Sequence, residues 1–214
     1  MDNPYFWILL LCIVFLTVVV YTYRDKCTVF ETIETEDGII QIVDEACQEG
    51  LPHTHDSETM RMTREVYEGT RKDDTILHER VHLDQKRNPA KWKDFYKTHW
   101  NYELFNTPPH SMPAAMVQKL RANPDTKHNP WVVWKDRYLF FPTFNETGKL
   151  KDAVVRVWDL STNQETDIPE QWKAFFCGER CPYQYEHPHE MSAEYLTRKC
   201  TSKAAQTLML WKNM

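Results

Sequence analysis

The chain has little glycine and no excess of positive charge. Five glycines stand against 12 prolines in 214 residues, and the sequence contains no internal repeat or low-complexity tract. With 42% hydrophobic and 13% aromatic residues, this composition excludes a disordered chain and predicts a folded domain with its own core. The formal net charge is −5, so the basic surface that nucleic-acid binding requires is missing and no nucleic-acid partner is predicted.

Cysteine pairs at CxxC spacing are also absent. Cys177 and Cys181 are separated by three residues instead of two. This spacing argues against a zinc ribbon and against a redox site of the CxxC type. Cys12 lies in an apolar run and is expected to be a packing residue. The sequence leaves open the oxidation state of the remaining five, which are Cys27, Cys47, Cys177, Cys181 and Cys200.

The segment 4–23 contains no charged residue. A helix of this length crosses a hydrocarbon core of about 30 Å, and aromatic residues stand at both of its ends. A cleaved signal peptide is the alternative, but a basic n-region and a small-residue cleavage site are missing. The sequence therefore predicts a transmembrane helix over 4–23 and a single-pass membrane protein.

The orientation of this expected span follows from the few charges beside it. Arg24 and Lys26 follow it, whereas only the amino terminus and Asp2 precede it. The positive-inside rule then places the large domain on the cytoplasmic, or virion-interior, side. The sequon at 145–147 would matter only in the opposite topology.

The first part of the soluble chain reads as a hairpin and a loop. Apolar residues flank an Asp37-Gly38 dipeptide within 28–43, which is a hairpin signal. Cys27 and Cys47 would lie near its open end, where a disulfide or two free thiols are equally compatible with the pattern. The cluster 53–56 (HTHD) could bind metal, but no further ligand lies at helical spacing, so a solvated loop is expected.

The remaining elements predict an α+β fold. A strand is expected over 60–69, and the helix after it should begin at Asp73, Asp74 or Thr75 and stop at Asn88-Pro89. Later elements are helices from Pro89, over 113–122, over 169–177 and from Pro188, and strands at 131–134, 138–141 and 153–158. We thus expect a hairpin and linker over 24–59 and a second domain over 60–214, with the strands as a β insertion.

The sequence at 78–82 is HERVH. Residues i and i+4 share one face of a helix, so His78 and His82 can bind one zinc ion at about 2.0–2.1 Å. Glu79 is not a ligand in this arrangement. It lies next to the first ligand, where it can act as general base toward a water molecule activated by the ion.

A third protein ligand is expected on a later helix. Leu83-Asp84-Gln85 follows His82, which excludes the metzincin extension. Glu190, in the first turn of the helix from Pro188, is the candidate. Either His187 or His189 is the alternative, which would give a three-histidine site. Glu194, one turn beyond Glu190, is expected to hydrogen-bond a ligand imidazole.

The order HERVHLDQ, then YEHPHEMSAEY about a hundred residues later, resembles the small gluzincin-like zinc metallopeptidase domains. The resemblance covers about 60–200 and implies a minimal zincin fold. It assigns His78, His82 and Glu190 as zinc ligands, Glu79 as general base and Gln85 as a structural residue. Similar domains occur in phages and large DNA viruses, sometimes as components of the particle.

The resemblance does not extend to a residue that would stabilise the tetrahedral oxyanion. The candidates are the polar residues close to Glu190 in sequence, namely Tyr183, Tyr185, His187 and His189. The function expected from these patterns is membrane-anchored, zinc-dependent hydrolysis of a peptide or protein substrate. The alternative is a non-catalytic structural or assembly protein, such as a virion component, that retains the zincin scaffold and contacts structural protein partners through its aromatic residues.

Overall fold

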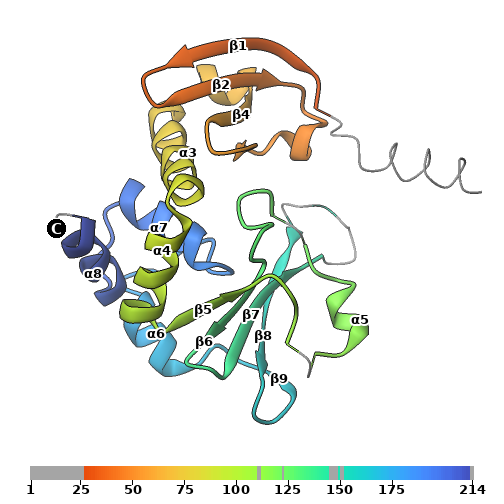
Figure 1. Cartoon of the computed structure of the whole chain (residues 1–214), viewed down its shortest axis with the longest axis vertical. Helices are drawn as coiled ribbons and strands as arrows, with labels where there is room; N and C mark the ends of the chain where they lie inside the picture. Colours follow the sequence, from red (N-terminus) through yellow and green to blue (C-terminus); the bar gives the residue numbers. More distant parts are fainter. Residues whose placement is uncertain (1–26, 110–111, 122, 145–148, 150–151, 213–214) are drawn as a thin grey trace, which may run out of the picture.

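The computed structural model describes residues 27–109, 112–121, 123–144, 149 and 152–212. The described chain has an α+β fold with two separate sheets. In Figure 1 the first sheet lies at the top, the second at the bottom, and the long helix α3 connects the two levels.

The first sheet contains four strands in the order β1-β2-β4-β3. Their bounds are Val29–Thr35 for β1, Gly38–Val43 for β2, His53–Thr54 for β3 and Thr59–Thr63 for β4. The hairpin expected at Asp37-Gly38 is present, because β1 pairs antiparallel with β2. A side chain at Gly38 would place its Cβ 2.3 Å from the carbonyl oxygen of Glu58, so this turn requires glycine.

Strand β2 then pairs in parallel with β4, and β3 pairs antiparallel with the other edge of β4. The hairpin and the residues after 59 therefore form one sheet. The prediction of a solvated loop at 53–56 is wrong in part, because His53 and Thr54 form strand β3 and are buried. Strand β3 is an edge strand of the sheet, and its backbone hydrogen bonds are made to β4. The sequence pattern did not indicate this pairing.

The strand expected over 60–69 is shorter than predicted. Strand β4 ends at Thr63, whose hydroxyl oxygen accepts a hydrogen bond from the backbone N–H of Val66 and begins helix α2 (Arg64–Glu68). Helix α3 then spans Lys72–Arg87, starting ahead of the expected caps at 73–75. It is followed directly by α4 (Pro89–Phe95), with Pro89 at the first helical position, as predicted.

The second sheet contains five antiparallel strands in sequence order, β5 to β9. Their bounds are Tyr102–Phe105, Trp131–Trp134, Tyr138–Thr143, Val154–Asp159 and Gln164–Thr166. The three strands expected at 131–158 are its centre, and β5 and β9 extend it on both sides. The helix predicted over 113–122 is reduced to one turn, α5 (Ala114–Val117).

The C-terminal helices pack beside this sheet (Figure 1). They are α6 (Glu170–Phe176), α7 (Pro188–Thr197) and α8 (Lys203–Lys212). The first two were expected, whereas α8 was not. Short helical segments at Cys47–Gly50 (η1) and Tyr96–Trp100 (η2, a π-helix) complete the described elements.

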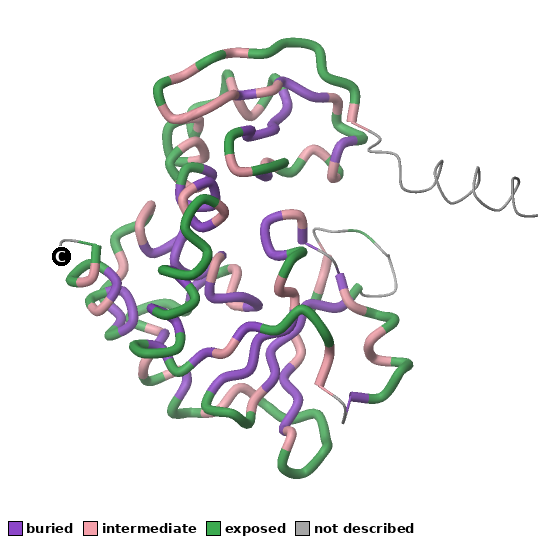
Figure 2. The backbone as a smooth tube through the Cα atoms, in the orientation of Figure 1, coloured by how far each residue is buried: buried purple, intermediate pink, exposed green. Residues whose placement is uncertain are grey.

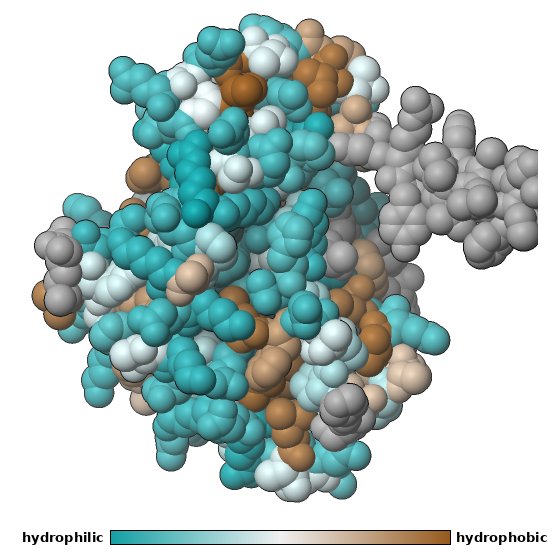
Figure 3. Space-filling model, in the orientation of Figure 1, coloured by the Kyte–Doolittle hydropathy of each residue, from teal (hydrophilic) through white to brown (hydrophobic). Residues whose placement is uncertain are grey.

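Burial follows this layout. In Figure 2 the outer strand β1 is mostly exposed, while the centre of the second sheet is buried. The face visible in Figure 3 is largely hydrophilic, with hydrophobic residues gathered over the second sheet and at the β1–β2 hairpin. Helix α3 serves both cores, because Leu83 packs under the first sheet and Val81 packs into the aromatic core below.

The expectation of a single-pass membrane protein is corrected by the described residues. Within 27–212, apart from the gaps given above, no helix is both long enough and apolar enough to cross a membrane. The predicted span over 4–23, and with it the inferred orientation, falls on residues outside those described. The sequon at 145–147 falls outside them too.

Candidate metal centre

Three of the predicted site residues meet where α3 crosses α7. His78 and His82 lie one turn apart on α3, and Glu190 lies in the first turn of α7. The Nε2 atoms of the two histidines are 3.1 Å apart. The Oε2 atom of Glu190 lies 3.4 Å from each of them.

These distances fit a tetrahedral zinc ion. Ligand atoms at about 2.0–2.1 Å from such an ion are separated by about 3.3 Å from one another. The three observed edges, 3.1, 3.4 and 3.4 Å, differ from this value by small amounts. Two imidazoles and one carboxylate also form the donor set of a catalytic zinc site with an open fourth position.

Gln85 orients the candidate ligand His82. The carbonyl oxygen of His189 can only accept a hydrogen bond, and it lies 3.1 Å from Nε2 of Gln85, so that atom is the amide nitrogen. The Oε1 atom of Gln85 must then accept a hydrogen bond, 2.8 Å long, from Nδ1 of His82. This bond leaves the lone pair of His82 on Nε2, facing the other two ligands.

The same amide links α3 to α7. Gln85 Nε2 also lies 2.9 Å from the hydroxyl of Ser192 and 3.2 Å from that of Tyr96, all of them buried. Gln85 was expected to be structural, and the geometry specifies how: it connects His82 on one helix to the backbone and a side chain of the other.

Asn123 orients the ligand Glu190. Its Nδ2 donates to Oε1 of Glu190 at 2.8 Å, which leaves Oε2 directed to the histidines. Asn123 belongs to the segment that leads from α5 to β6, and no spacing relation to HERVH or to Glu190 could have revealed it. A chain segment outside both motifs therefore completes the site.

Glu79 lies beside the triad and is 3% exposed. Its Oε2 is buried without a hydrogen-bond partner among the described residues. Burial raises the pKa of the Glu79 carboxyl well above its ordinary value, and the nearby carboxylates of Asp125 and Glu190 raise it further. An ionised Glu79 therefore needs a cation or a proton donor in this space.

Asp125 is a second residue that the sequence did not indicate. Carboxylate oxygens of Asp125 and Glu79 and a ring nitrogen of His82 lie within 4.8 Å of one another. Asp125 Oδ1 accepts hydrogen bonds from the backbone N–H and hydroxyl of Thr54, and lies 3.2 Å from Nζ of Lys86. These contacts hold the 123–125 segment against β3 and α3.

The electrostatics of the triad favour positive charge. Burial alone would lower the pKa of His82, but Glu190 and Asp125 outweigh it and raise this pKa to about 10. The two histidines in turn hold the pKa of Glu190 well below its usual value, against the effect of burial. The same field attracts a divalent cation, whose binding must displace any proton on His82.

Glu194 does not contact a ligand imidazole. Its Oε2 accepts hydrogen bonds from the backbone N–H groups of Tyr183 and Gln184, at 2.8 and 3.2 Å, and its Oε1 pairs with Arg198 at 2.7 Å. The expected imidazole contact is therefore wrong, because the side chain is directed to the loop before α7. Glu194 instead holds the loop that carries Tyr183.

The four candidate oxyanion residues separate into one that faces the cavity and three that do not line it. Tyr183 is exposed and lines a cavity of about 990 Å³ together with His78, Glu79, His82 and Glu190. The ring of Tyr185 packs against Trp172. His187 caps α7 through the backbone N–H of His189 and bonds the carbonyl of Asn129.

His187 and His189 are also unsuitable as zinc ligands in this arrangement. Both side chains lie outside the set of atoms that converge on the triad. Burial lowers the pKa of His187 to about 4 and that of His189 well below its usual value, so both are neutral. The three-histidine alternative is not what the geometry favours.

No family model matches this sequence, and no similar curated protein or solved structure was found. The resemblance to gluzincins therefore depends on the two motifs and stays a prediction. The triad itself is a property of the structure.

Proposed function

We propose that this protein is a zinc-dependent hydrolase that cleaves a peptide bond. The observation that carries the proposal is the triangle of His78, His82 and Glu190, whose edges suit tetrahedral zinc, with the buried carboxylate of Glu79 beside it. The donor set and the unpartnered Oε2 of Glu79 fit the ion. A zinc ion held there polarises a substrate carbonyl and lowers the pKa of bound water to about 7.

The residues of the chain supply the remaining roles. Glu79 accepts the proton of the attacking water and delivers it to the leaving amine. Gln85 and Asn123 hold His82 and Glu190 in position, through bonds of 2.8 Å each. Tyr183 is the candidate for stabilising negative charge on the substrate oxygen, because it lines the cavity and Glu194 holds its backbone.

The cavity is large enough to hold a peptide segment. Its lining comes from η1, from β3 of the first sheet, from α2, α3 and α7, and from Arg121 and the 123–125 segment. A volume of about 990 Å³ is at the upper end of the range for small-molecule sites, which is about 300–1,000 Å³. A peptide segment of several residues is the substrate class that this proposal names.

The test compares two Glu→Gln variants of the oxidised protein. Glu79→Gln keeps size and shape but removes the proton acceptor, so we expect unchanged zinc content and loss of peptide-library hydrolysis by at least about 10²–10⁴-fold. Glu65→Gln is the control, because Glu65 lines the same cavity from α2 and is exposed. It should retain both zinc and activity.

Zinc analysis tests the metal separately. The oxidised wild type should hold about one zinc ion, and His82→Ala should hold none, since it leaves only two ligands. A wild type that binds no zinc on titration would contradict the proposed centre. A zinc-loaded wild type that cleaves no peptide, with Glu79→Gln behaving like wild type in every assay, would favour the non-catalytic scaffold.

A further inference from the structure

A second cluster of metal-ligating side chains lies at the open end of the β1–β2 hairpin. Cys27 and Cys47 form a disulfide there, as the pattern allowed. His53 of strand β3 lies against it, with Nε2 3.9 Å from Sγ of Cys47. Each of the three residues offers one possible ligand atom, and these atoms lie within 4.8 Å of one another.

The tautomer of His53 is fixed by a backbone carbonyl. Its Nδ1 lies 3.0 Å from the oxygen of Leu51, which can only accept, so Nδ1 carries the hydrogen. The lone pair is therefore on Nε2 and faces the disulfide.

In the oxidised protein this lone pair meets a poor partner. A disulfide sulfur has no hydrogen to donate, and His53 and Cys47 are only 4% and 1% exposed. Buried acceptors are normally satisfied. A thiol hydrogen or a metal ion held by the two sulfurs would be a stronger partner for Nε2 than the disulfide sulfur at 3.9 Å, and both require the disulfide to open.

We propose that reduction converts this disulfide into a second zinc site, with Cys27, Cys47 and His53 as ligands. Two cysteines and one histidine are a known donor set for zinc with an exchangeable fourth position. A tetrahedral ion places sulfur and nitrogen about 3.6 Å apart. The distance between Cys47 Sγ and His53 Nε2 is 3.9 Å, so this pair is close to the required spacing.

The chemistry balances as two separate steps. A phosphine reductant and one water cleave the S–S bond, which gives two thiols and the phosphine oxide. Zinc then binds the two sulfurs, which release one proton each to solvent, and accepts the Nε2 lone pair of His53. The Nδ1–H of His53 still donates its hydrogen bond to the carbonyl oxygen of Leu51. Either crosslink joins Cys27 to Cys47 across the same 20 residues, so the hairpin stays closed in both redox states.

This site is independent of the proposed hydrolase centre, because the two share no ligand. The test measures zinc in the full chain with and without the phosphine. Oxidised wild type should hold about one zinc ion and reduced wild type about two. In His78→Ala/His82→Ala, which lacks the first centre, these values should become about zero and one.

Cobalt identifies the ligands. Reduced His78→Ala/His82→Ala loaded with Co²⁺ should show a thiolate-to-cobalt charge-transfer band in the near ultraviolet. The band should disappear when Cys27→Ser/Cys47→Ser is added. It should persist with Cys177→Ser/Cys181→Ser, the matched control, because that second disulfide is opened by the same reductant.

His53→Ala guards against a folding artefact, since it leaves both cysteines in place. It should weaken the additional zinc by more than about 100-fold, the upper limit for residues that only support a ligand. It should leave the zinc of the oxidised protein unchanged. The proposal is overturned if reduction adds no zinc, if His53→Ala binds the additional ion as tightly as wild type, or if the band depends on Cys177 and Cys181.

Discussion

The two sheets of this protein are stabilised in different ways. Under the first sheet the buried cluster is aliphatic and small, and consists of Ile40, Ile42, Met60, Met62 and Leu83. Around the second sheet the cluster is larger and dominated by aromatic rings, among them Trp92, Trp100, Trp134, Trp172, Phe140 and Phe176. A disulfide that closes a long loop adds stability that a small core cannot supply by burial alone. A large aromatic core is stabilised mainly by the apolar surface that it buries.

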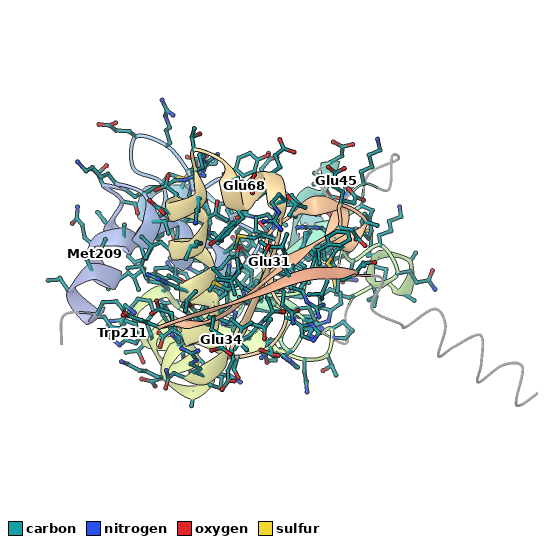
Figure 4. The ribbon with its side chains drawn as sticks, turned by 90° about the horizontal axis from the view of Figure 1, so that it is seen from above. Glu31, Glu34, Glu45, Glu68, Met209 and Trp211 are labelled. Carbon is teal, nitrogen blue, oxygen red and sulfur yellow. A yellow bond between two sulfur atoms is a disulfide. The ribbon has the colours of Figure 1, made fainter. Side chains whose placement is uncertain are left out.

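The two regions also differ in net charge. Between residues 29 and 68 the sequence has eleven Asp and Glu against two Arg, although the whole chain has 31 acidic and 26 basic residues. Figure 4 shows four of these acidic side chains, with Glu31 and Glu34 on β1, Glu45 in the loop after β2 and Glu68 at the end of α2. The candidate metal centre lies on α3, which packs into both cores, and on α7, which packs into the aromatic core.

The largest expected effect is loss of an aromatic residue from the second core. Trp172 is fully buried, stacks on Phe140 and Phe176, and donates its indole N–H to the hydroxyl of Tyr102 at 2.7 Å. Trp172→Ala should lower the free energy of unfolding by about 3–5 kcal/mol. Ile40→Val, under the first sheet, should cost about 0.5–1.5 kcal/mol. Urea titration checks both, and a larger loss for Ile40→Val would reverse the comparison.

The two disulfides should contribute unequally. The bond between Cys27 and Cys47 closes a sequence separation of 20, whereas that between Cys177 and Cys181 closes one of 4. Loop-closure entropy then predicts losses of about 3 and about 2 kcal/mol for the respective double Ser variants, under oxidising conditions without zinc. Denaturant unfolding measures this difference. Equal losses would show that the first sheet does not depend on its crosslink as we describe.

The junction between the regions should respond to Gln85. Gln85→Met keeps the length of the side chain but removes the bonds to His82, Ser192 and Tyr96. Zinc affinity should fall by about 10–100-fold, as for other residues that orient a ligand. Gln206→Met is the control, since Gln206 lies on α8 and its amide donates to the backbone of Thr201 at the surface. Unchanged affinity in Gln85→Met would contradict the assigned role.

The smallest effect concerns an ion pair between Arg137, in the turn from β6 to β7, and Asp159, the last residue of β8. Arg137 donates to both carboxylate oxygens of Asp159, and Ser161 donates from its backbone and its hydroxyl. Arg137 holds the pKa of Asp159 well below its usual value. The stabilisation is therefore complete above the unfolded pKa of about 3.9 and is lost as pH falls through the lower folded value.

We expect Asp159→Asn to lower the free energy of unfolding by about 1 kcal/mol at neutral pH, because Arg137 is half exposed and solvent screens the pair. The difference from wild type should shrink in acid. Thermal unfolding at several pH values measures it. A difference that grows as pH falls would mean that another group is responsible.

The sequence by itself determined the local elements and one half of the candidate centre. The Asp37-Gly38 turn, the helices that begin at Pro89 and Pro188, and the central strands of the second sheet all follow short-range rules of turn chemistry and periodicity. The spacing of His78 and His82 is of the same kind, because one helical turn brings them together. Glu190 was a candidate from its place in the first turn of a later helix, and the resemblance to gluzincins named it as well. The structure brings it within 3.4 Å of both imidazoles.

Contacts between distant segments were decided by tertiary structure alone. Burial of His53 depends on pairing with β4, and the role of Glu194 depends on which loop passes its carboxylate. Asn123 and Asp125 reach the centre from a segment with no periodic pattern. Such contacts arise from packing of the whole chain, in which a side chain meets partners some 70 residues away, and no local regularity in the sequence encodes that meeting.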